Sequence, residues 1–253
     1  MLFAYSSLFC LRKKTKMLKF RNWVNTEKIN YYLLSKNPRA IQFLEQNPDK
    51  IAWSALCANP AAMHLIQRNQ KLIDWRILSG NPAAIELLEE NIEKASWFLL
   101  AKNPEALTLL KENPNNLFWR PFSANPAAIP MLKQNPDQID WESLSSNPAA
   151  IQILEDNPHL IEWSALSSNP AAMHLLEAKP ESIDWFILNE NPAAIDLLEA
   201  NLDKIEHTIY ENPNIFEYDY EGMKEKTGIF VEELMSKCFN PKNLDKFEAW
   251  GFE

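Results

Sequence analysis

Apolar residues recur along this chain with a strict period of 22 residues. Tryptophan marks the period, and no insertion or deletion interrupts the column between positions 53 and 185. The column consists of Trp53, Trp75, Trp97, Trp119, Trp141, Trp163 and Trp185. Tyr31 and His207 occupy the equivalent positions on either side. A fixed period of this length indicates a stack of similar structural units, each of which packs on its neighbours.

The segment that opens each unit predicts a helix. It begins with an Asn-Pro pair, and asparagine is a favoured N-cap while proline is favoured at the first helical position. In NPAAIELLEE, at 81–90, the residues Ala84, Ile85, Leu87 and Leu88 form an apolar stripe on one side of a helix. The pairs begin at Asn37, Asn59, Asn81, Asn103, Asn125, Asn147, Asn169 and Asn191.

The segment that carries the tryptophan predicts a turn or short 3₁₀ piece, followed by a helix of about two turns. In NPDQIDWESLSS, at 135–146, Ile139 and Trp141 lie about 200° apart around a helix, so they do not share one stripe. Pro121 fits a helix that begins near position 118, because its missing N–H then falls in the first turn. Acidic residues often precede the tryptophan, and aspartate there is a good cap whereas glutamate is not.

The repeat register divides the chain into three parts. Residues 1–24 are expected to be a poorly ordered N-terminal extension, with Met17 as an alternative first residue. Residues 25–211 are expected to form an all-α solenoid of about eight two-helix repeats. Stacked helices lie ~8–10 Å apart, which predicts a rod or arc of about 70–80 Å. Residues 212–253 are expected to be a C-terminal helical cap, with helices at 228–239 and 240–251.

Composition excludes several function classes. The net charge is −9, which disfavours a general affinity for nucleic acid. Only four glycines occur, and they leave no Gly-rich phosphate loop. The three cysteines are far apart and form neither a disulfide framework nor a zinc site, which fits a reducing compartment. No apolar run is long enough to span a membrane. We expect no enzymatic activity, no cofactor and no metal; His174 with Glu177 is interpreted as a surface pair.

The repeated columns each have a structural and a functional interpretation. The tryptophans are interpreted as repeated core positions, with an exposed aromatic ladder as the alternative. The asparagines are interpreted as individual caps, with a ladder of side-chain amides along the array as the alternative. The acidic column is interpreted as helix caps, with an exposed strip that attracts a basic partner as the alternative. Its members in successive units are Asp140, Glu162, Asp184 and Glu206.

Recognition is expected to use the columns that vary between units. The residue after each tryptophan varies most clearly, and arginine and aromatic residues are frequent in binding hot spots. Arg76, Phe98 and Arg120 are therefore the candidate partner-binding residues, together with Glu142 and Phe186 of the same column. The alternative is that this column is solvated and has diverged without a function.

The units NPAAIELLEEN, NPAAIDLLEAN and NPDQIDWESLSSNPAAI resemble the 22-residue tandem repeats encoded by large DNA viruses of algae and protists. The resemblance covers roughly residues 23–211, and the block IFEYDYEGMKEKTGIFVEEL at 215–234 is similar to the ending of such chains. It implies a viral origin and no particular activity. We therefore expect a non-enzymatic scaffold that binds a protein partner inside the host cell, in its cytoplasm. The alternative is a structural component of a virus particle or assembly.

Overall fold

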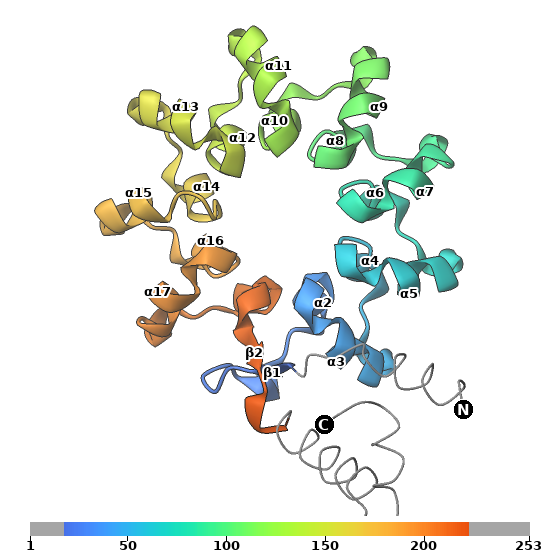
Figure 1. The fold of residues 1–253 in the computed structure, drawn as a ribbon, viewed down its shortest axis with the longest axis vertical. Helices are drawn as coiled ribbons and strands as arrows, with labels where there is room; N and C mark the ends of the chain where they lie inside the picture. The colour runs from blue at the N-terminus through green and yellow to red at the C-terminus, as the bar shows by residue number, and fades with distance from the viewer. Residues whose placement is uncertain (1–17, 223–253) are drawn as a thin grey trace, which may run out of the picture. The chain divides into compact units, whose positions relative to one another are not determined.

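The structure, a computed structural model, describes residues 18–222. The described chain falls into two compact units, and the repeat array lies entirely in the one formed by residues 22–215. Each repeat contributes two short α-helices, so the expected all-α repeat fold is confirmed. The helices that begin at the tryptophan column form an inner circle, and the helices that follow the Asn-Pro pairs form an outer circle (Figure 1).

The inner helices are α2 (Tyr31–Lys36), α4 (Trp53–Leu56), α6 (Trp75–Leu78), α8 (Trp97–Leu100), α10 (Trp119–Ser123), α12 (Trp141–Ser145), α14 (Trp163–Ser167) and α16 (Trp185–Leu188). The outer helices are α3 (Ile41–Gln46), α5 (Met63–Arg68), α7 (Ile85–Glu89), α9 (Leu107–Glu112), α11 (Ile129–Gln134), α13 (Ile151–Asp156), α15 (Met173–Ala178) and α17 (Ile195–Glu199). Helices this short do not persist alone in water and depend on packing between units.

Short 3₁₀ turns precede most of these helices. Those before outer helices are η2 (Pro38–Ala40), η4 (Pro60–Ala62), η6 (Pro82–Ala84), η8 (Pro104–Ala106), η10 (Pro126–Ala128), η12 (Pro148–Ala150) and η15 (Pro192–Ala194). Those before inner helices are η3 (Pro48–Lys50), η5 (Gln70–Leu72), η7 (Ile92–Lys94), η9 (Pro114–Asn116), η11 (Pro136–Gln138), η13 (Pro158–Leu160) and η14 (Pro180–Ser182). The array starts with η1 (Thr26–Lys28) and ends with η16 (Leu202–Lys204), η17 (His207–Glu211) and η18 (Pro213–Ile215).

Local capping follows the sequence prediction closely. Asn81 accepts a hydrogen bond from the backbone N–H of Ala83 at 3.0 Å, and Pro82 occupies the position where no donor is needed. Asp140 caps its inner helix by accepting from the N–H of Ser143 at 2.8 Å, whereas Glu162 makes no such cap. Pro121 lies in the first turn of α10, as predicted. The inner helices span about one turn instead of the two that were expected.

The core consists of small and branched side chains, with the tryptophans at its margin. Each unit buries an alanine, one large apolar side chain from its inner helix and one from its outer helix; Ala128, Phe122 and Leu132 are an example, all fully buried. The tryptophans of the column are only half-buried, so the expectation that they form the core is corrected to a position at its edge. Lys94 lies 4.6 Å above the Trp75 ring and covers part of its face.

Fully buried asparagine side chains connect each unit to the preceding one. Asn125 donates from Nδ2 to the Ala101 carbonyl at 2.9 Å and to the Asn103 carbonyl at 2.9 Å. Its Oδ1 simultaneously accepts from the N–H of Ala127 at 2.9 Å. Each of these asparagine side chains therefore caps its own unit and also forms a rung of the amide ladder. Both interpretations of the asparagine column hold. The members are Asn37, Asn59, Asn81, Asn103, Asn125, Asn147, Asn169, Asn191 and Asn212.

The ladder closes on itself, so the array is a ring and not the open rod or arc that was expected. Asn37, in the first full repeat, donates to the carbonyls of Tyr210 at 3.1 Å and Asn212 at 2.9 Å. All the remaining members of the ladder make the same two bonds to the unit that precedes them. Helix α2 packs against η17 at this junction (Figure 1), and Lys36 forms an ion pair with Glu211 at 2.8 Å. No cap is needed over an exposed end face in such a ring.

The second unit contains a two-stranded antiparallel sheet. Strand β1 (Leu18–Phe20) pairs with β2 (Phe216–Tyr218), and Phe20 lies opposite Phe216 with ring centroids 4.5 Å apart. The expectation of poor order throughout 1–24 is therefore wrong for the strand at 18–20, because backbone pairing holds it. The described part of the expected helical cap at 212–253 contains the 3₁₀ turn η18 and the strand β2 at 216–218. Residues 1–17 and the predicted helices at 228–239 and 240–251 lie outside the described residues.

Asn125→Ala should lower the free energy of unfolding by about 3 kcal/mol, because it removes three hydrogen bonds to buried backbone groups. Asn135→Ala is the matched control: this half-buried asparagine makes one bond, to the Met131 carbonyl at 2.9 Å, and its loss should cost about 1 kcal/mol. Urea unfolding followed by far-UV circular dichroism measures both. Equal losses would contradict a special role for the buried ladder.

Asn37→Ala distinguishes the closed ring from an open array. In the ring, Asn37 is an interior member that bonds to Tyr210 and Asn212, so its loss should cost about as much as the loss of Asn125, roughly 3 kcal/mol. In an open array it would belong to an end unit with no preceding unit to bond. A cost below about 1 kcal/mol in the same urea experiment would show that the ring does not close in solution.

Candidate functional site

The variable column after the tryptophans is exposed on the inner helices. Arg76, Phe98, Arg120, Glu142 and Phe186 are all exposed, as the partner-binding hypothesis requires. The residue four positions later lies at the end of each inner helix or in the turn that follows it, and forms a second column. These two columns, hereafter the inner surface, are held by the buried asparagine and leucine positions beneath them. Thr208, at the end of the array, departs from the pattern and is buried.

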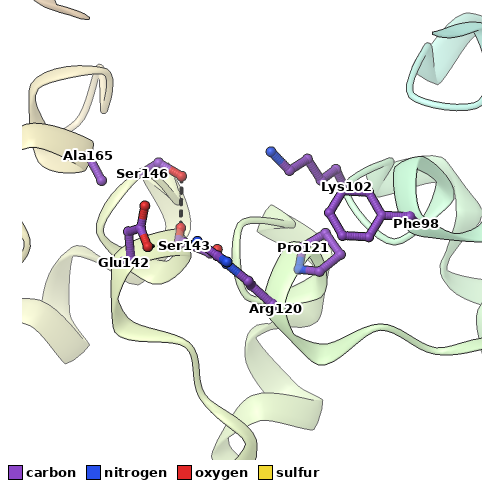
Figure 2. A pocket seen from close by; sticks show the side chains of 8 residues that line it. All are labelled: Phe98, Lys102, Arg120, Pro121, Glu142, Ser143, Ser146 and Ala165. Atoms are coloured by element: carbon purple, nitrogen blue, oxygen red, sulfur yellow. Dashed lines mark hydrogen bonds and ion pairs between the residues drawn. The ribbon is translucent and has the colours of Figure 1, made fainter.

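Within residues 18–222, a pocket lies on the inner surface between α8, α10, α12 and α14. Its volume is about 260 Å³. Phe98, Lys102, Arg120 and Pro121 line one side, and Glu142, Ser143, Ser146 and Ala165 line the other (Figure 2). The structure therefore brings together three of the predicted residues, Phe98, Arg120 and Glu142. Arg76 belongs to the preceding unit, and Phe186 lies elsewhere in the array against His207, at 5.5 Å between ring centroids.

Aromatic and charged contacts hold the pocket walls. The Phe98 ring meets the Phe118 ring edge-on, with centroids 5.8 Å apart. Arg120 forms an ion pair with Glu142 at 2.8 Å, and its Nε lies 3.8 Å from an oxygen of Asp140. Because the Arg120 side chain is 65% exposed, this pair contributes little to stability and serves mainly to orient the guanidinium.

The charges of the inner surface are divided between two arcs. The basic arc covers α6, α8 and α10, where Arg76, Lys102 and Arg120 are the charged residues of the two columns. The acidic arc runs from α12 to η17 and carries Glu142, Glu190 and Glu211. Burial, and secondly the Glu211 carboxylate, raise the pKa of Glu190, while Lys36 opposes this shift. Ion pairs lie at both ends of the acidic arc: Glu142 pairs with Arg120 of the basic arc, and Glu211 pairs with Lys36 of α2.

Sequence reasoning missed two residues of the site, Lys102 and Phe118. Lys102 could have been found, because it lies four positions after Phe98, a spacing at which side chains are neighbours wherever the chain turns helically. Phe118 occupies the column where Asp74 and Asp140 cap their helices, so it is an aromatic side chain in a polar column. Its contact with Phe98 of the preceding unit follows from the stacking of units and not from the local sequence.

A serine column, also missed, makes a second connection between units. Ser123 donates to the Trp119 carbonyl at 2.9 Å and accepts from the N–H of Asp140 at 3.1 Å. Cys57 occupies the same column and accepts from the N–H of Asp74 at 3.3 Å. Burial raises the pKa of the Cys57 thiol, although the hydrogen bond from Asp74 acts in the opposite direction. These residues are structural, and Cys57 substitutes for a serine.

The aspartates of the acidic column and two of the histidines, His64 and His174, bind neighbouring residues. Asp184 caps Ile187 at 3.2 Å and also accepts from the Ser164 hydroxyl at 2.7 Å. The interpretation of this column as caps is confirmed for Asp140 and Asp184 and is wrong for Glu162 and Glu206, which make no side-chain cap. His174 pairs with Glu155 of the preceding outer helix at 2.9 Å, so the predicted partner Glu177 is corrected. Within residues 18–222 no group of three or more His, Cys, Asp or Glu side chains is placed to hold a metal, and no helix there is long and apolar enough to cross a membrane.

Comparison with protein-family models, with curated proteins and with solved structures found no match for this chain.

Replacing Arg76, Phe98 and Arg120 together by serine should change the melting temperature by no more than about 2 °C, because surface positions away from caps and cores contribute little to stability. Thermal unfolding followed by circular dichroism measures this. A fall of about 10 °C or more would show that the three side chains belong to the packing of the ring and not to a free surface.

Proposed function

We propose that this chain is a non-enzymatic scaffold that binds a protein partner through its inner surface. The observation that supports the proposal is a division of roles among the repeat columns. Asparagine, leucine and alanine columns are buried and repeat with little change, whereas the column after each tryptophan is exposed from Tyr32 to Phe186 and changes chemistry from unit to unit. A repeat protein that keeps its framework and varies one exposed column presents a binding surface.

Ring closure favours binding by this surface. Each inner helix is tied to both neighbours by buried hydrogen bonds, so the exposed side chains are held in place before a partner arrives. The resemblance of the repeats to those of large DNA viruses supports a partner in the infected host cell. The other role considered, a component of a virus particle, rests on that resemblance alone.

Capture of a partner from a lysate of algal or protist host cells tests the proposal. The immobilised full chain should retain a specific protein, and the Arg76, Phe98 and Arg120 triple serine variant should lose at least about nine-tenths of it, since hot-spot residues dominate binding. The matched control replaces Glu86, Thr108 and Gln152 by serine, three exposed residues of the outer helices. Undiminished capture by the first variant, or equal loss by both, would contradict binding through the inner surface.

A further inference from the structure

We propose that Phe98, Lys102, Phe118 and Arg120, hereafter the basic–aromatic patch, bind an acidic linear segment of a protein in which carboxylate side chains alternate with aromatic ones. This inference rests on the proposed function and names the chemistry of the partner. Three features of the patch support it: a pair of exposed aromatic rings, a lysine without an ion-pair partner within residues 18–222 beside a partly paired arginine, and an acidic boundary that limits how much negative charge the site accepts.

The aromatic pair supplies an apolar surface that is exposed to water. Phe98 is 47% exposed and Phe118 is 48% exposed, and the two rings meet edge-on at 5.8 Å between centroids. Pro121 continues this surface into the pocket beside Phe98 (Figure 2). An aromatic side chain of the partner would pack edge-on against these rings, which is a favoured geometry between aromatic side chains. This contact would remove the exposed apolar surface of Phe98 and Phe118 from water.

The cations select the charge of the ligand. Lys102 is exposed and lines the pocket, and its ammonium group has no ion-pair or hydrogen-bond partner within residues 18–222. Arg120 uses part of its guanidinium on Glu142 and keeps further N–H donors exposed. Asp140 and Glu142 offset part of the Arg120 charge, so Lys102, next to the exposed rings, supplies most of the attraction for a carboxylate.

The acidic arc excludes long polyanions. Glu142 forms the opposite wall of the pocket, and Glu190 and Glu211 follow along the inner surface. A nucleic acid strand or a phosphate-rich chain that extended beyond the patch would bring like charges together at these carboxylates. A peptide with one or two carboxylates beside an aromatic residue gains the attraction of Lys102 and Arg120 without this repulsion. The favoured ligand is therefore an acidic–aromatic peptide segment.

Fluorescence anisotropy with the full chain and a labelled probe peptide, Gly-Asp-Phe-Glu-Phe-Gly, tests the inference. Two matched probes carry Asn and Gln in place of the acids, or Ser in place of the phenylalanines. The acidic–aromatic probe should bind at least about tenfold more tightly than either, and its affinity should fall when salt is raised from about 50 mM to about 300 mM, because exposed charges are then screened. Equal binding of the amide probe would overturn the inference.

Single substitutions locate the binding. Phe98→Ser and Lys102→Gln should each weaken the acidic–aromatic probe by about fivefold or more. The controls are Leu72→Ser, which removes an equally exposed apolar side chain (47%), and Lys133→Gln, which removes an exposed lysine of an outer helix; both should stay within about twofold. Equal effects of patch and control variants, or displacement of the probe by a single-stranded oligonucleotide at equal concentration, would overturn the inference.

The two proposals fail in different experiments. If capture of the host protein depends on Arg76, Phe98 and Arg120 but the unlabelled probe does not compete with that protein, the proposed function stands and the acidic–aromatic partner is wrong. If capture is independent of these residues, binding through the inner surface is wrong. The probe affinities and the patch variants then still decide whether the basic–aromatic patch is a site for acidic–aromatic segments.

Discussion

The buried asparagine of each unit is the interaction on which the rest of the structure depends. A primary amide buried in an apolar core must satisfy all of its hydrogen-bonding capacity. Asn147 does so by bonding to its own unit through Ala149 and to the preceding unit through the carbonyls of Ser123 and Asn125. From Asn59 to Asn191 the two bonded carbonyls lie 24 and 22 residues before their asparagine, so these bonds fix the spacing between units. The strict period of 22 residues is the consequence.

Ring closure follows from the same geometry. At the end of the array the register is one residue short, and Asn212 reaches the carbonyls of Asn189 and Asn191 across sequence separations of 23 and 21 in place of 24 and 22. Asn37 then bonds to Tyr210 and Asn212, and the Tyr210 hydroxyl donates to the Asn25 carbonyl at 2.6 Å. A closed cycle leaves no end unit with unsatisfied buried groups, which an open array of such short helices would have to cover.

This framework leaves the inner surface free to differ between units. Where residues of the variable column contact the next unit, they do so through exposed side chains, as Phe98 contacts Phe118 and Arg120 contacts Glu142. Such exposed contacts contribute little to stability. Charge and aromatic character can therefore change from unit to unit while the ring stays intact. The basic arc, the acidic arc and the pocket where they meet are products of that freedom.

The sequence by itself determined the local structure: the Asn-Pro helix starts, the aspartate caps that glutamate does not replace, and the place of Pro121 in a first turn. These depend on bonds between residues two to four positions apart, which the residue types specify. Only the tertiary structure decided that the tryptophans are half-buried, that Asn125 serves as cap and ladder at once, and that Lys102 and Phe118 join Phe98. It also decided ring closure, because a small rotation per unit, summed over the array, separates an arc from a ring, and the repeat period does not encode that rotation.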